Sequence, residues 1–309
     1  MNTFIIGIIV YFLAINFLGI VLTIHDKRAA RRGAWRVKER TLLLVSVLGG
    51  SVAMLITMRI IRHKTKHLKF MLGIPAIIVV QFSIAVLLFF LFYHGVLLFN
   101  NPSKKNYPVR GVDVSSYQGE IDWALLAEND IEFAFIKATE GSSFVDEYFL
   151  KNYENALKTD LRIGAYHFFS YDSSGLTQAQ NFISVVGKID DMLPPVVDVE
   201  FYGDKEKNLP DKDDVTRELT AFLTAIEEHY NQKPIIYATE KSYKLYISEN
   251  FSDYDIWIRN VFTSPSNNKD WTFWQYTNRE KLDGYSGKEK FIDMNVFNGS
   301  QEEFESYGE

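Results

Sequence analysis

The chain has 309 residues, of which 47% are hydrophobic and 15% aromatic, enough to build more than one folded unit. It has no cysteine, which excludes disulfides, thiol catalysis and thiolate metal sites. Its net charge of -6 conceals two opposite parts: residues 1–110 carry 15 basic and 2 acidic residues, and residues 111–309 carry 18 basic and 37 acidic residues. Two parts so different in charge are expected to face different surroundings.

Three apolar segments predict a helical membrane domain over residues 1–100. Residues 4–24 and 71–99 contain no Asp, Glu, Lys or Arg, and each exceeds the roughly 20 residues that a helix needs to cross a bilayer. Residues 41–58 form a shorter third segment, interrupted by Gly49 and Gly50. No basic residue precedes the first segment and no small-residue cleavage site follows it, so we expect a retained anchor rather than a cleaved signal.

The loops between these segments are strongly basic. Residues 25–40 carry seven Lys or Arg and residues 59–69 carry five, so the positive-inside rule favours the cytoplasm for both. Three full crossings would put the two loops on opposite sides. If residues 41–58 instead dip in and return, both loops stay inside while the later part of the chain lies outside. We favour this re-entrant arrangement, with the lipid bilayer as the partner of residues 1–100 and the basic loops touching anionic headgroups. Binding of a nucleic acid or a lipid-linked precursor is the less favoured alternative, and no nucleic-acid partner is expected.

Residues 101–108 are polar, contain two prolines and are predicted to be a linker. From residue 109 to 309 short apolar strands alternate with helical stretches such as 148–158 and 215–230. The strands are predicted at 109–114, 133–138, 162–169, 195–200, 234–238, 255–258, 273–276 and 292–296. This alternation indicates a parallel sheet, and eight strands in about 200 residues fit a compact (β/α) barrel. Because the last connections are too short for full helices, the predicted fold is α/β, an irregular TIM-like barrel preceded by an α-helical transmembrane domain.

Asp198 and Glu200 stand two residues apart at the end of an apolar strand, so their side chains share one face. Two carboxylates held that close repel each other, and one pKa is expected to rise. A carboxylic acid still protonated near neutral pH is the proton donor that glycoside hydrolysis needs. Such a pair on its own is more often structural or part of an ion pair, so its context decides.

The carboxyl ends of barrel strands form the reactive face of this kind of fold. We expect Asp113 and Asp293 to join Asp198 and Glu200 there, although each alone would suit a helix cap or an ion pair. Other side chains expected at the same strand ends, as substrate-binding groups, are Lys137, Glu140, His167, Tyr237, Trp257 and Gln275. Aromatic faces for sugar stacking are expected from Tyr166, Phe168, Tyr237, Trp257, Trp274 and Tyr276, each of which would equally suit the core. No His or Cys cluster indicates a metal, and no cofactor is expected.

The same residues carry a resemblance to a known family. The runs Gly111-Val112-Asp113-Val114-Ser115, Phe135-Ile136-Lys137-Ala138-Thr139-Glu140-Gly141, Gly164-Ala165-Tyr166-His167-Phe168, Pro195-x-x-Asp198-x-Glu200, Trp274-Gln275-Tyr276 and Asp293-x-Asn295-x-Phe297 resemble, in order, the motifs of glycoside hydrolase family 25, the Chalaropsis-type lysozymes. The resemblance covers about residues 109–299. It implies an irregular barrel that cleaves the β-1,4 bond between N-acetylmuramic acid and N-acetylglucosamine, with Glu200 as general acid and Asp198, Asp113 and Asp293 lining the site. Arg259 departs from the family pattern, in which a small residue is more usual, and this puts the substrate preference in doubt.

The first part resembles a second family. Asp26-Lys27-x-x-Ala30, Arg36-x-x-Glu39-Arg40-Thr41-Leu42-Leu43, Leu48-Gly49-Gly50-Ser51 and Arg62-His63-Lys64-Thr65 are similar to the small membrane family catalogued as domain of unknown function 1294. The resemblance covers roughly residues 4–80 and implies no activity.

Together these patterns predict a membrane-anchored peptidoglycan hydrolase, with its catalytic domain on the extracellular face of a Gram-positive cell membrane, acting on peptidoglycan glycan strands during wall remodelling. Two alternatives stay open: a non-catalytic peptidoglycan-binding module that presents the membrane domain, and a transport or lipid-handling membrane domain with the enzyme as accessory. Asp198 either orients the substrate's N-acetyl group as nucleophile, which we favour, or attacks directly, and Asp293 could instead hold a water for inversion.

Overall fold

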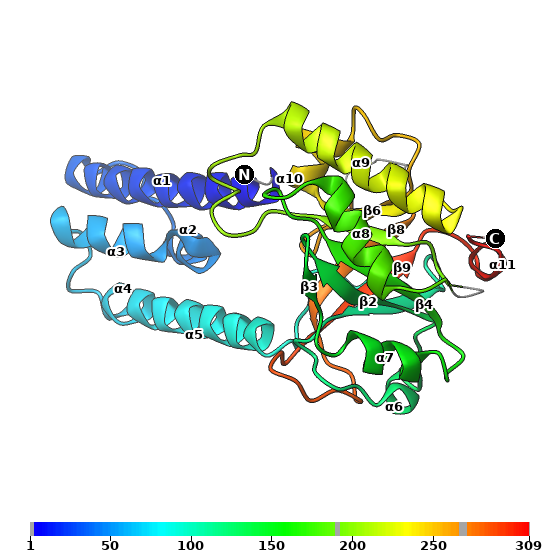
Figure 1. Cartoon of the computed structure of the whole chain (residues 1–309). Coiled ribbons are helices and arrows are strands. Elements are labelled where there is room, and N and C mark those ends of the chain that lie inside the picture. Colours follow the sequence, from blue (N-terminus) through cyan, green and yellow to red (C-terminus); the bar gives the residue numbers. More distant parts are fainter. Residues whose placement is uncertain (1–2, 189–191, 266–270, 309) are drawn as a thin grey trace. The chain divides into compact units, whose positions relative to one another are not determined.

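The computed structural model describes residues 3–188, 192–265 and 271–308. The chain divides into two compact units, Met1–Tyr93 and His94–Glu309 (Figure 1). The first unit is helical, and the second contains all the strands assigned in the described residues.

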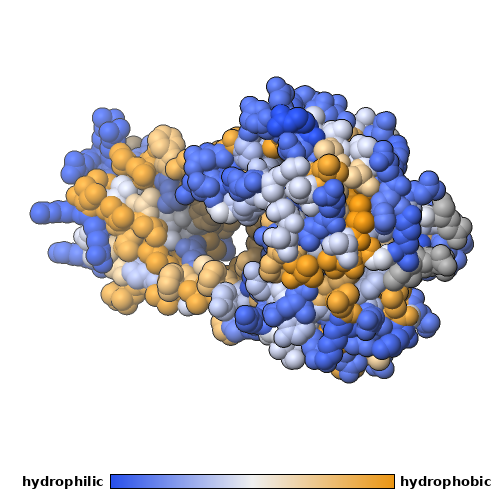
Figure 2. Space-filling view, in the orientation of Figure 1, coloured by the Kyte–Doolittle hydropathy of each residue, from blue (hydrophilic) through white to orange (hydrophobic). Residues whose placement is uncertain are grey.

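The helical unit consists of α1 (Thr3–Arg32), α2 (Glu39–Val45), the π-helical turn η1 (Ser46–Gly50), α3 (Ser51–Ile60), α4 (Leu68–Met71) and α5 (Gly73–Tyr93). Among the described residues, three segments are long and apolar enough to cross a membrane: Ile6–Arg32, Glu39–Ile60 and Leu68–Tyr93. Figure 2 shows apolar side chains spread over the surface of this unit, as expected for a lipid-facing fold. The three apolar segments predicted from the sequence are therefore confirmed as largely helical, although α5 ends at Tyr93 and the predicted segment extended to residue 99.

The middle apolar segment folds back on itself. Gly49 has φ +113°, a conformation that other residues adopt only with strain, and it reverses the chain between α2 and α3. The two arms then pack together, with Ser46 Oγ 3.4 Å from the sulfur of Met54. The arms share one buried cluster with the start of the last helices, made of Leu42, Val45, Met54, Met58, Phe70 and Ile74. Glu39–Ile60 is thus a helical hairpin.

The second unit is a closed barrel. Its strands are β1 (Arg110–Val114), β2 (Phe133–Glu140), β4 (Arg162–Phe168), β5 (Val196–Val199), β6 (Ile235–Thr239), β7 (Ile256–Arg259), β8 (Phe273–Glu280) and β9 (Ile292–Phe297), and β3 (Phe144–Val145) forms a small hairpin on β2. The order β1-β9-β8-β7-β6-β5-β4-β2 is closed by pairing of β1 with β2. All neighbouring pairs are parallel except those of β9, which is antiparallel to both β8 and β1. The predicted irregular barrel and its eight strands are confirmed.

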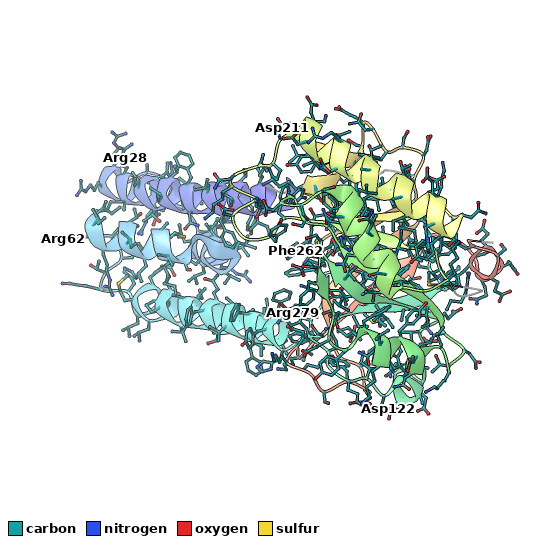
Figure 3. The ribbon with its side chains drawn as sticks, viewed as in Figure 1. Arg28, Arg62, Asp122, Asp211, Phe262 and Arg279 are labelled. Atoms are coloured by element: carbon teal, nitrogen blue, oxygen red, sulfur yellow. The ribbon has the colours of Figure 1, made fainter. Side chains whose placement is uncertain are left out.

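Helices surround this barrel: α6 (Trp123–Ala127), α7 (Phe149–Ala156), α8 (Gly175–Val185), α9 (Lys212–Tyr230), α10 (Glu240–Ser242) with the π-helical η2 (Tyr243–Ile247), and α11 (Gln301–Glu305). The longest, α9, begins at Asp211 (Figure 3), whose side chain accepts hydrogen bonds from the amides of Asp213 and Asp214. It ends at Asn231, which has the left-handed conformation. Its buried stripe faces the sheet: Val215, Leu219, Phe222, Leu223 and Ile226.

Alternation along the strands separates two cores. Phe133 and Phe135 of β2 point into the barrel, where they meet the rings of Trp257 and Phe273. Ala134 and Ile136 point outward into the layer between sheet and helices. Fully burying each such aromatic or branched side chain stabilises the fold by about 1.5–3 kcal/mol. Aromatic side chains fill the barrel near the amino-terminal ends of the parallel strands, and polar side chains replace them toward the carboxyl ends.

The segment before β1, predicted to be a linker over residues 101–108, packs against the barrel instead. Asn100 donates from Nδ2 to the carbonyls of Asn260 (3.0 Å), Thr263 (3.2 Å) and Tyr276 (3.3 Å). The carbonyl of Pro102 accepts a hydrogen bond from Arg110, and the ring of Tyr107 lies 5.8 Å from Trp271 and 6.1 Å from Trp274. The polar composition indicated irregular backbone, which the segment has. It did not indicate that the segment would be held against the barrel by hydrogen bonds and ring contacts.

Candidate active site

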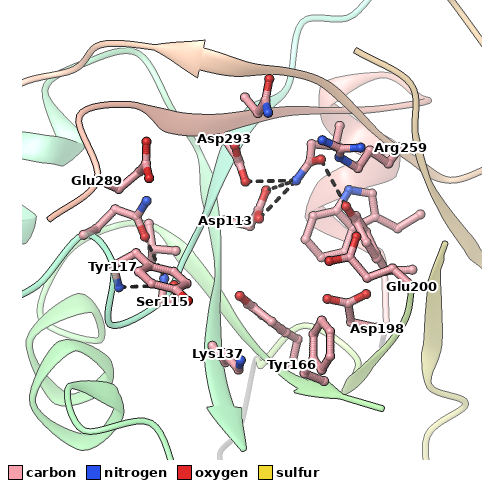
Figure 4. Close-up of a pocket in the computed structure, with 17 residues that line it drawn as sticks. Asp113, Ser115, Tyr117, Lys137, Tyr166, Asp198, Glu200, Arg259, Glu289 and Asp293 are labelled. Atoms are coloured by element: carbon pink, nitrogen blue, oxygen red, sulfur yellow. Dashed lines mark hydrogen bonds between the residues drawn. The ribbon is translucent and has the colours of Figure 1, made fainter. Parts of the chain in front are cut away.

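A pocket of about 390 Å³ opens at the carboxyl ends of the parallel strands (Figure 4). It brings together all four predicted carboxylates, Asp113, Asp198, Glu200 and Asp293. It is also lined by six of the predicted substrate-binding residues: Lys137, Tyr166, Phe168, Tyr237, Trp257 and Gln275. Residues far apart in the sequence therefore meet in one cavity of the size that ligand sites have.

Strand direction explains how each carboxylate reaches the pocket. Asp113 is near the end of β1, Asp198 near the end of β5, and Glu200 follows β5 directly. Asp293 was expected at a carboxyl-terminal strand end, and this expectation was wrong: it is the second residue of β9. Because β9 runs antiparallel, its start lies at the mouth, where Asp293 pairs with Asp113 in the register of the two strands.

Asp113 lies at the centre of a hydrogen-bond network. Gln275 donates from Nε2 to Oδ1 (2.9 Å) and Oδ2 (3.1 Å) of Asp113 and to Oδ2 of Asp293 (3.3 Å). Asn295 donates to Asp113 Oδ1 at 2.7 Å. Behind these amides, Tyr237 donates to the Gln275 carbonyl oxygen (3.1 Å) and the Trp257 indole donates to that of Asn295 (2.8 Å), which fixes both amide orientations.

This network separates the two carboxyls electrostatically. Burial raises the pKa of Asp113, and the amide donors of Asn295 and Gln275 oppose the rise by stabilising its charged form. Burial and then the charge of Asp113 raise the pKa of Asp293 well above its usual value. The pKa of both carboxyls is therefore raised, and the rise is larger for Asp293 than for Asp113.

Asp198 and Glu200 form the second pair, and the pKa of both is raised. Burial and then the Glu200 charge raise the pKa of Asp198 well above its usual value. Burial and the charge of Asp113 raise the pKa of Glu200, while Arg259 and Lys137 oppose that rise. The sequence predicted one raised pKa, with Asp198 acting on Glu200. The stronger effect falls on Asp198 because it is the more deeply buried, with 8% exposed surface. Asp198 Oδ1 is buried with no hydrogen-bond partner among the described residues.

Two cations face the carboxylates. Lys137 donates to Glu140 at 2.7 Å and lies over the ring of Phe168, 4.8 Å from its centroid. Arg259, at the end of β7, lines the pocket, and its charge opposes the raised pKa of Glu200 and of Asp293. The residue that departs from the family pattern is thus part of the pocket wall.

Two predicted substrate-binding residues do not line the pocket. His167 lies between the pocket-lining Tyr166 and Phe168, so alternation turns it outward, where its ring nitrogens bond Thr139 (2.8 Å) and Gln178 (3.0 Å). Burial lowers its pKa to about 4, which keeps the ring neutral. Glu140 lies beside the pocket and reaches it only through its ion pair with Lys137. The expected stacking residues Trp274 and Tyr276 likewise belong to the outer core.

Loops add residues that sequence reasoning missed. Ser115, Tyr117 and Gln118 follow β1, Asn278 lies near the end of β8, and Glu289 comes from the connection between β8 and β9; all five line the pocket. The amide of Glu289 donates to the Tyr117 carbonyl and that of Gly287 to the Gln118 carbonyl, both at 2.9 Å, which joins the two loops into one wall. Such loop pairing leaves no periodic signal in a sequence. Among the described residues, no three His, Cys, Asp or Glu side chains are grouped as metal ligands.

The fold and this constellation agree with the family comparison. Residues 112–285, more than half of the chain, match the model for glycosyl hydrolases family 25. The chain belongs to glycosyl hydrolases family 25. This family 25 member is a glycoside hydrolase with an additional segment, residues 16–70, that matches the protein family of unknown function DUF1294.

Relatives support the same assignment. The family 25 glycosyl hydrolase from Bacillus anthracis is 55% identical, with a TM-score of 0.65, over 69% of this chain and 98% of that one. The Escherichia coli protein YegX is 34% identical over 209 residues, 65% of this chain and 74% of its own length. Lysozyme M1 of Streptomyces globisporus is 32% identical over 214 residues, 62% of this chain and 68% of its own. Each of the three similarities covers between 62% and 69% of this chain, which is about the length of the barrel unit, so none of them accounts for the whole chain.

Proposed function

We propose that this family 25 hydrolase is a membrane-anchored lysozyme that cleaves the β-1,4 bond between N-acetylmuramic acid and N-acetylglucosamine in peptidoglycan. The similarity to Lysozyme M1 supports the substrate class. The observation that carries the chemistry is the convergence in one pocket of four carboxyl groups whose pKa values are raised to different extents. Pairs of carboxyls in contrasting environments are how acid and base roles are divided at neutral pH.

Glu200 is the general acid in this proposal. Its raised pKa keeps a proton available, and it gives that proton to the glycosidic oxygen as the bond from this oxygen to the anomeric carbon breaks. Positive charge then develops on the anomeric carbon and ring oxygen of the sugar. Asp113, whose charged form is stabilised by hydrogen bonds from Gln275 and Asn295, is positioned to stabilise that charge without moving.

Asp198 has the geometry to handle the substrate's acetamido group. Its unpaired Oδ1 can accept the acetamido N–H, which favours the ionised form of Asp198 and turns the acetyl oxygen toward the anomeric carbon. That oxygen then forms a bond to carbon as the leaving group departs, and water later opens the ring with retention of configuration. The competing routes are direct attack by Asp198 and inversion through a water at Asp293. Proton NMR of the first-formed anomer distinguishes them: an inverted product would exclude the acetamido route.

The decisive experiment uses the full chain, purified in detergent and incubated with purified peptidoglycan. Products are reduced with borohydride and analysed by mass spectrometry. We expect reduced muramic acid at the new chain ends, because the bond cleaved leaves muramic acid reducing. Reduced glucosamine ends would refute the proposed bond, and absence of products would favour a non-catalytic wall-binding module.

Glu200→Gln is the matched variant for this assay, since it keeps size and hydrogen bonding but cannot give up a proton in the same way. Loss of a general acid typically lowers the rate by about 10²–10⁴-fold. We expect kcat to fall by that amount while pulldown of intact peptidoglycan is retained. Near-full activity of the variant would remove Glu200 from its role.

The membrane anchor and the wall substrate together define the proposed setting. The apolar helices of residues 3–93 support residence in the cell membrane, and a peptidoglycan substrate supports an extracellular barrel. Local trimming of the cell's own wall follows from these two properties, in a bacterium whose wall is within reach of its plasma membrane. Fractionation followed by protease treatment of intact spheroplasts tests this: digestion of the barrel is expected, and full protection would contradict it.

A further inference from the structure

The hairpin of Glu39–Ile60 has its tip beside the middle of both long helices. The Tyr11 hydroxyl of α1 donates to the Leu48 carbonyl at 2.9 Å, and Asn16 Nδ2 donates to the Gly49 carbonyl at 3.3 Å. From the other side, Gln81 of α5 donates to the carbonyls of Ser46 (3.0 Å) and Val47 (2.8 Å). Tyr11 and Asn16 lie near the centre of the charge-free stretch 4–24, and Gln81 lies near the centre of α5.

These contacts answer the main energetic objection to a turn inside a membrane. Residues 46–50 form a π-helical turn with a non-helical conformation at Gly49, so regular α-helical bonding is interrupted around the carbonyls of residues 46–49. An unsatisfied polar backbone group in hydrocarbon costs several kcal/mol, so non-helical backbone at that depth must find partners within the protein. Each of the four carbonyls has a side-chain donor on α1 or α5. The structure therefore provides what a buried turn needs.

The open end of the hairpin is fastened to the end of α1. The buried carboxylate of Asp26 accepts from the Val37 amide (3.1 Å), His63 Nε2 (2.7 Å) and Lys64 Nζ (3.0 Å). Beside it, Lys27 donates to the Arg62 carbonyl at 2.9 Å. The two basic loops, one before the hairpin and one after it, thus meet at the same end of the unit. Figure 3 shows Arg28 and Arg62 together at that end.

The length of the arms fits a half-crossing. From Glu39 to Leu48 an α-helix rises about 14 Å, roughly half of the ~30 Å hydrocarbon thickness. Three full crossings would need residues 39–60 to run straight, which would pull Val37 and His63 to opposite membrane surfaces. Their shared bonds to Asp26 forbid that arrangement.

We propose that residues 1–93 cross the membrane only twice, through α1 and α5, with Glu39–Ile60 as a re-entrant hairpin, and that the two basic loops form one cytoplasmic surface that binds anionic phospholipid headgroups. This cationic face consists of ten exposed side chains: Arg28, Arg31, Arg32, Arg36, Lys38, Arg40, Arg59, Arg62, Lys66 and Lys69. The proposal is independent of the reaction proposed for the barrel.

Charge and position select lipid as the partner. Asp26, one of the two acidic residues in this unit, is fully buried. Its negative charge pairs with His63 and Lys64 and therefore does not offset the exposed basic side chains of the cationic face. Arg28, Arg31 and Arg32 follow helical i, i+3, i+4 spacing at the end of a membrane helix, which places them together at headgroup level. Basic side chains at this level attract anionic lipid by about 1 kcal/mol each, or about five-fold in affinity.

The topology is tested with single-cysteine variants. Because the chain has no cysteine, no native residue has to be replaced first. Ala34→Cys, Thr65→Cys and Ser103→Cys all lie at exposed positions, and the full-length variants are treated with a membrane-impermeant maleimide on intact spheroplasts. We expect labelling of Ser103→Cys before lysis, and of Ala34→Cys and Thr65→Cys only after lysis. Labelling of Ala34→Cys from outside, with Thr65→Cys protected, is the pattern of three full crossings and would overturn the proposal.

The lipid contact is tested with Thr65→Cys carrying an environment-sensitive fluorophore, in full-length protein reconstituted into phosphatidylcholine vesicles with rising phosphatidylglycerol. Replacing Arg31, Arg32 and Lys66 by Gln is expected to raise the half-saturating phosphatidylglycerol fraction by on the order of 100-fold, or to abolish saturation. The matched control replaces the exposed Lys158, Lys207 and Lys288 of the barrel and should change nothing. A fluorescence signal that does not respond to phosphatidylglycerol but is saturated by a single-stranded RNA oligonucleotide would show that the cationic face binds nucleic acid, and would overturn the proposed lipid binding.

Discussion

Asn295→Ala tests the idea that the polar network around Asp113 is built to hold one carboxylate charged in a buried place. The residue is fully buried and makes two bonds, from Nδ2 to Asp113 (2.7 Å) and from the Trp257 indole to its Oδ1 (2.8 Å). A hydrogen bond to a charged group is worth about 1.5–3 kcal/mol, and an orphaned buried donor costs about 1–3 kcal/mol. We therefore expect the free energy of unfolding to fall by about 3–5 kcal/mol.

The assay is urea unfolding of residues 94–309, followed by tryptophan fluorescence. The barrel unit matches a Bacillus anthracis chain over 98% of that chain's length, so we expect it to fold alone. Asn298→Ala is the matched control, because the same residue type there makes one exposed bond to the Trp271 carbonyl at 3.0 Å and should cost under about 1 kcal/mol. If Asn295→Ala loses no more than the control, the network does not carry the stabilisation assigned to it.

Three further predictions concern charge and position in the same unit. Asp198 has a raised pKa in the folded state, so the folded chain binds more protons than the unfolded one, and the free energy of unfolding falls as pH rises from about 4 through the raised pKa. Asp198→Asn should remove this fall and raise Tm at pH 8; a Tm–pH profile unchanged from wild type would contradict this prediction. Arg259 opposes the raised pKa of Glu200, so Arg259→Gln should move the alkaline limb of the kcat/KM profile to higher pH, whereas Lys241→Gln, on the surface, should leave it in place. His167→Ala should lower the free energy of unfolding by about 2–4 kcal/mol, because it breaks two buried hydrogen bonds, while kcat changes less than two-fold; a large loss of kcat in the folded variant would return His167 to the site.

The strand positions were predictable because each strand is an apolar run bounded by turn residues. The predicted segments 162–169 and 292–296, for example, differ from β4 and β9 by one residue each. The position of His167 was also within reach of the sequence. Since Tyr166 and Phe168 were assigned to the pocket, period-two alternation already required the residue between them to point the other way.

Other features depend on contacts that no local pattern encodes. The direction of β9 follows from the short connection of residues 281–291, which allows an antiparallel return where a full helix would have forced a parallel one. Tyr117 and Glu289 meet only because two loops exchange backbone hydrogen bonds across the mouth. In the helical unit, the basic loops and the Gly49-Gly50 pair favoured a re-entrant segment, but the donors that satisfy its turn, Tyr11, Asn16 and Gln81, are single polar residues inside apolar runs.

The fastening of residues 100–107 to the barrel has a consequence for where an anchored enzyme of this kind can work. Eight free residues would extend to about 28 Å and let the catalytic mouth wander through the wall. With Asn100, Pro102 and Tyr107 committed to barrel contacts, residues 94–99 separate the end of α5 at Tyr93 from the first of these contacts. Fully extended, that stretch spans about 20 Å. The barrel itself is about 40 Å across for a unit of its length, so it is larger than the segment that joins it to α5. We therefore expect a protein anchored in the proposed way to act on the glycan nearest the membrane.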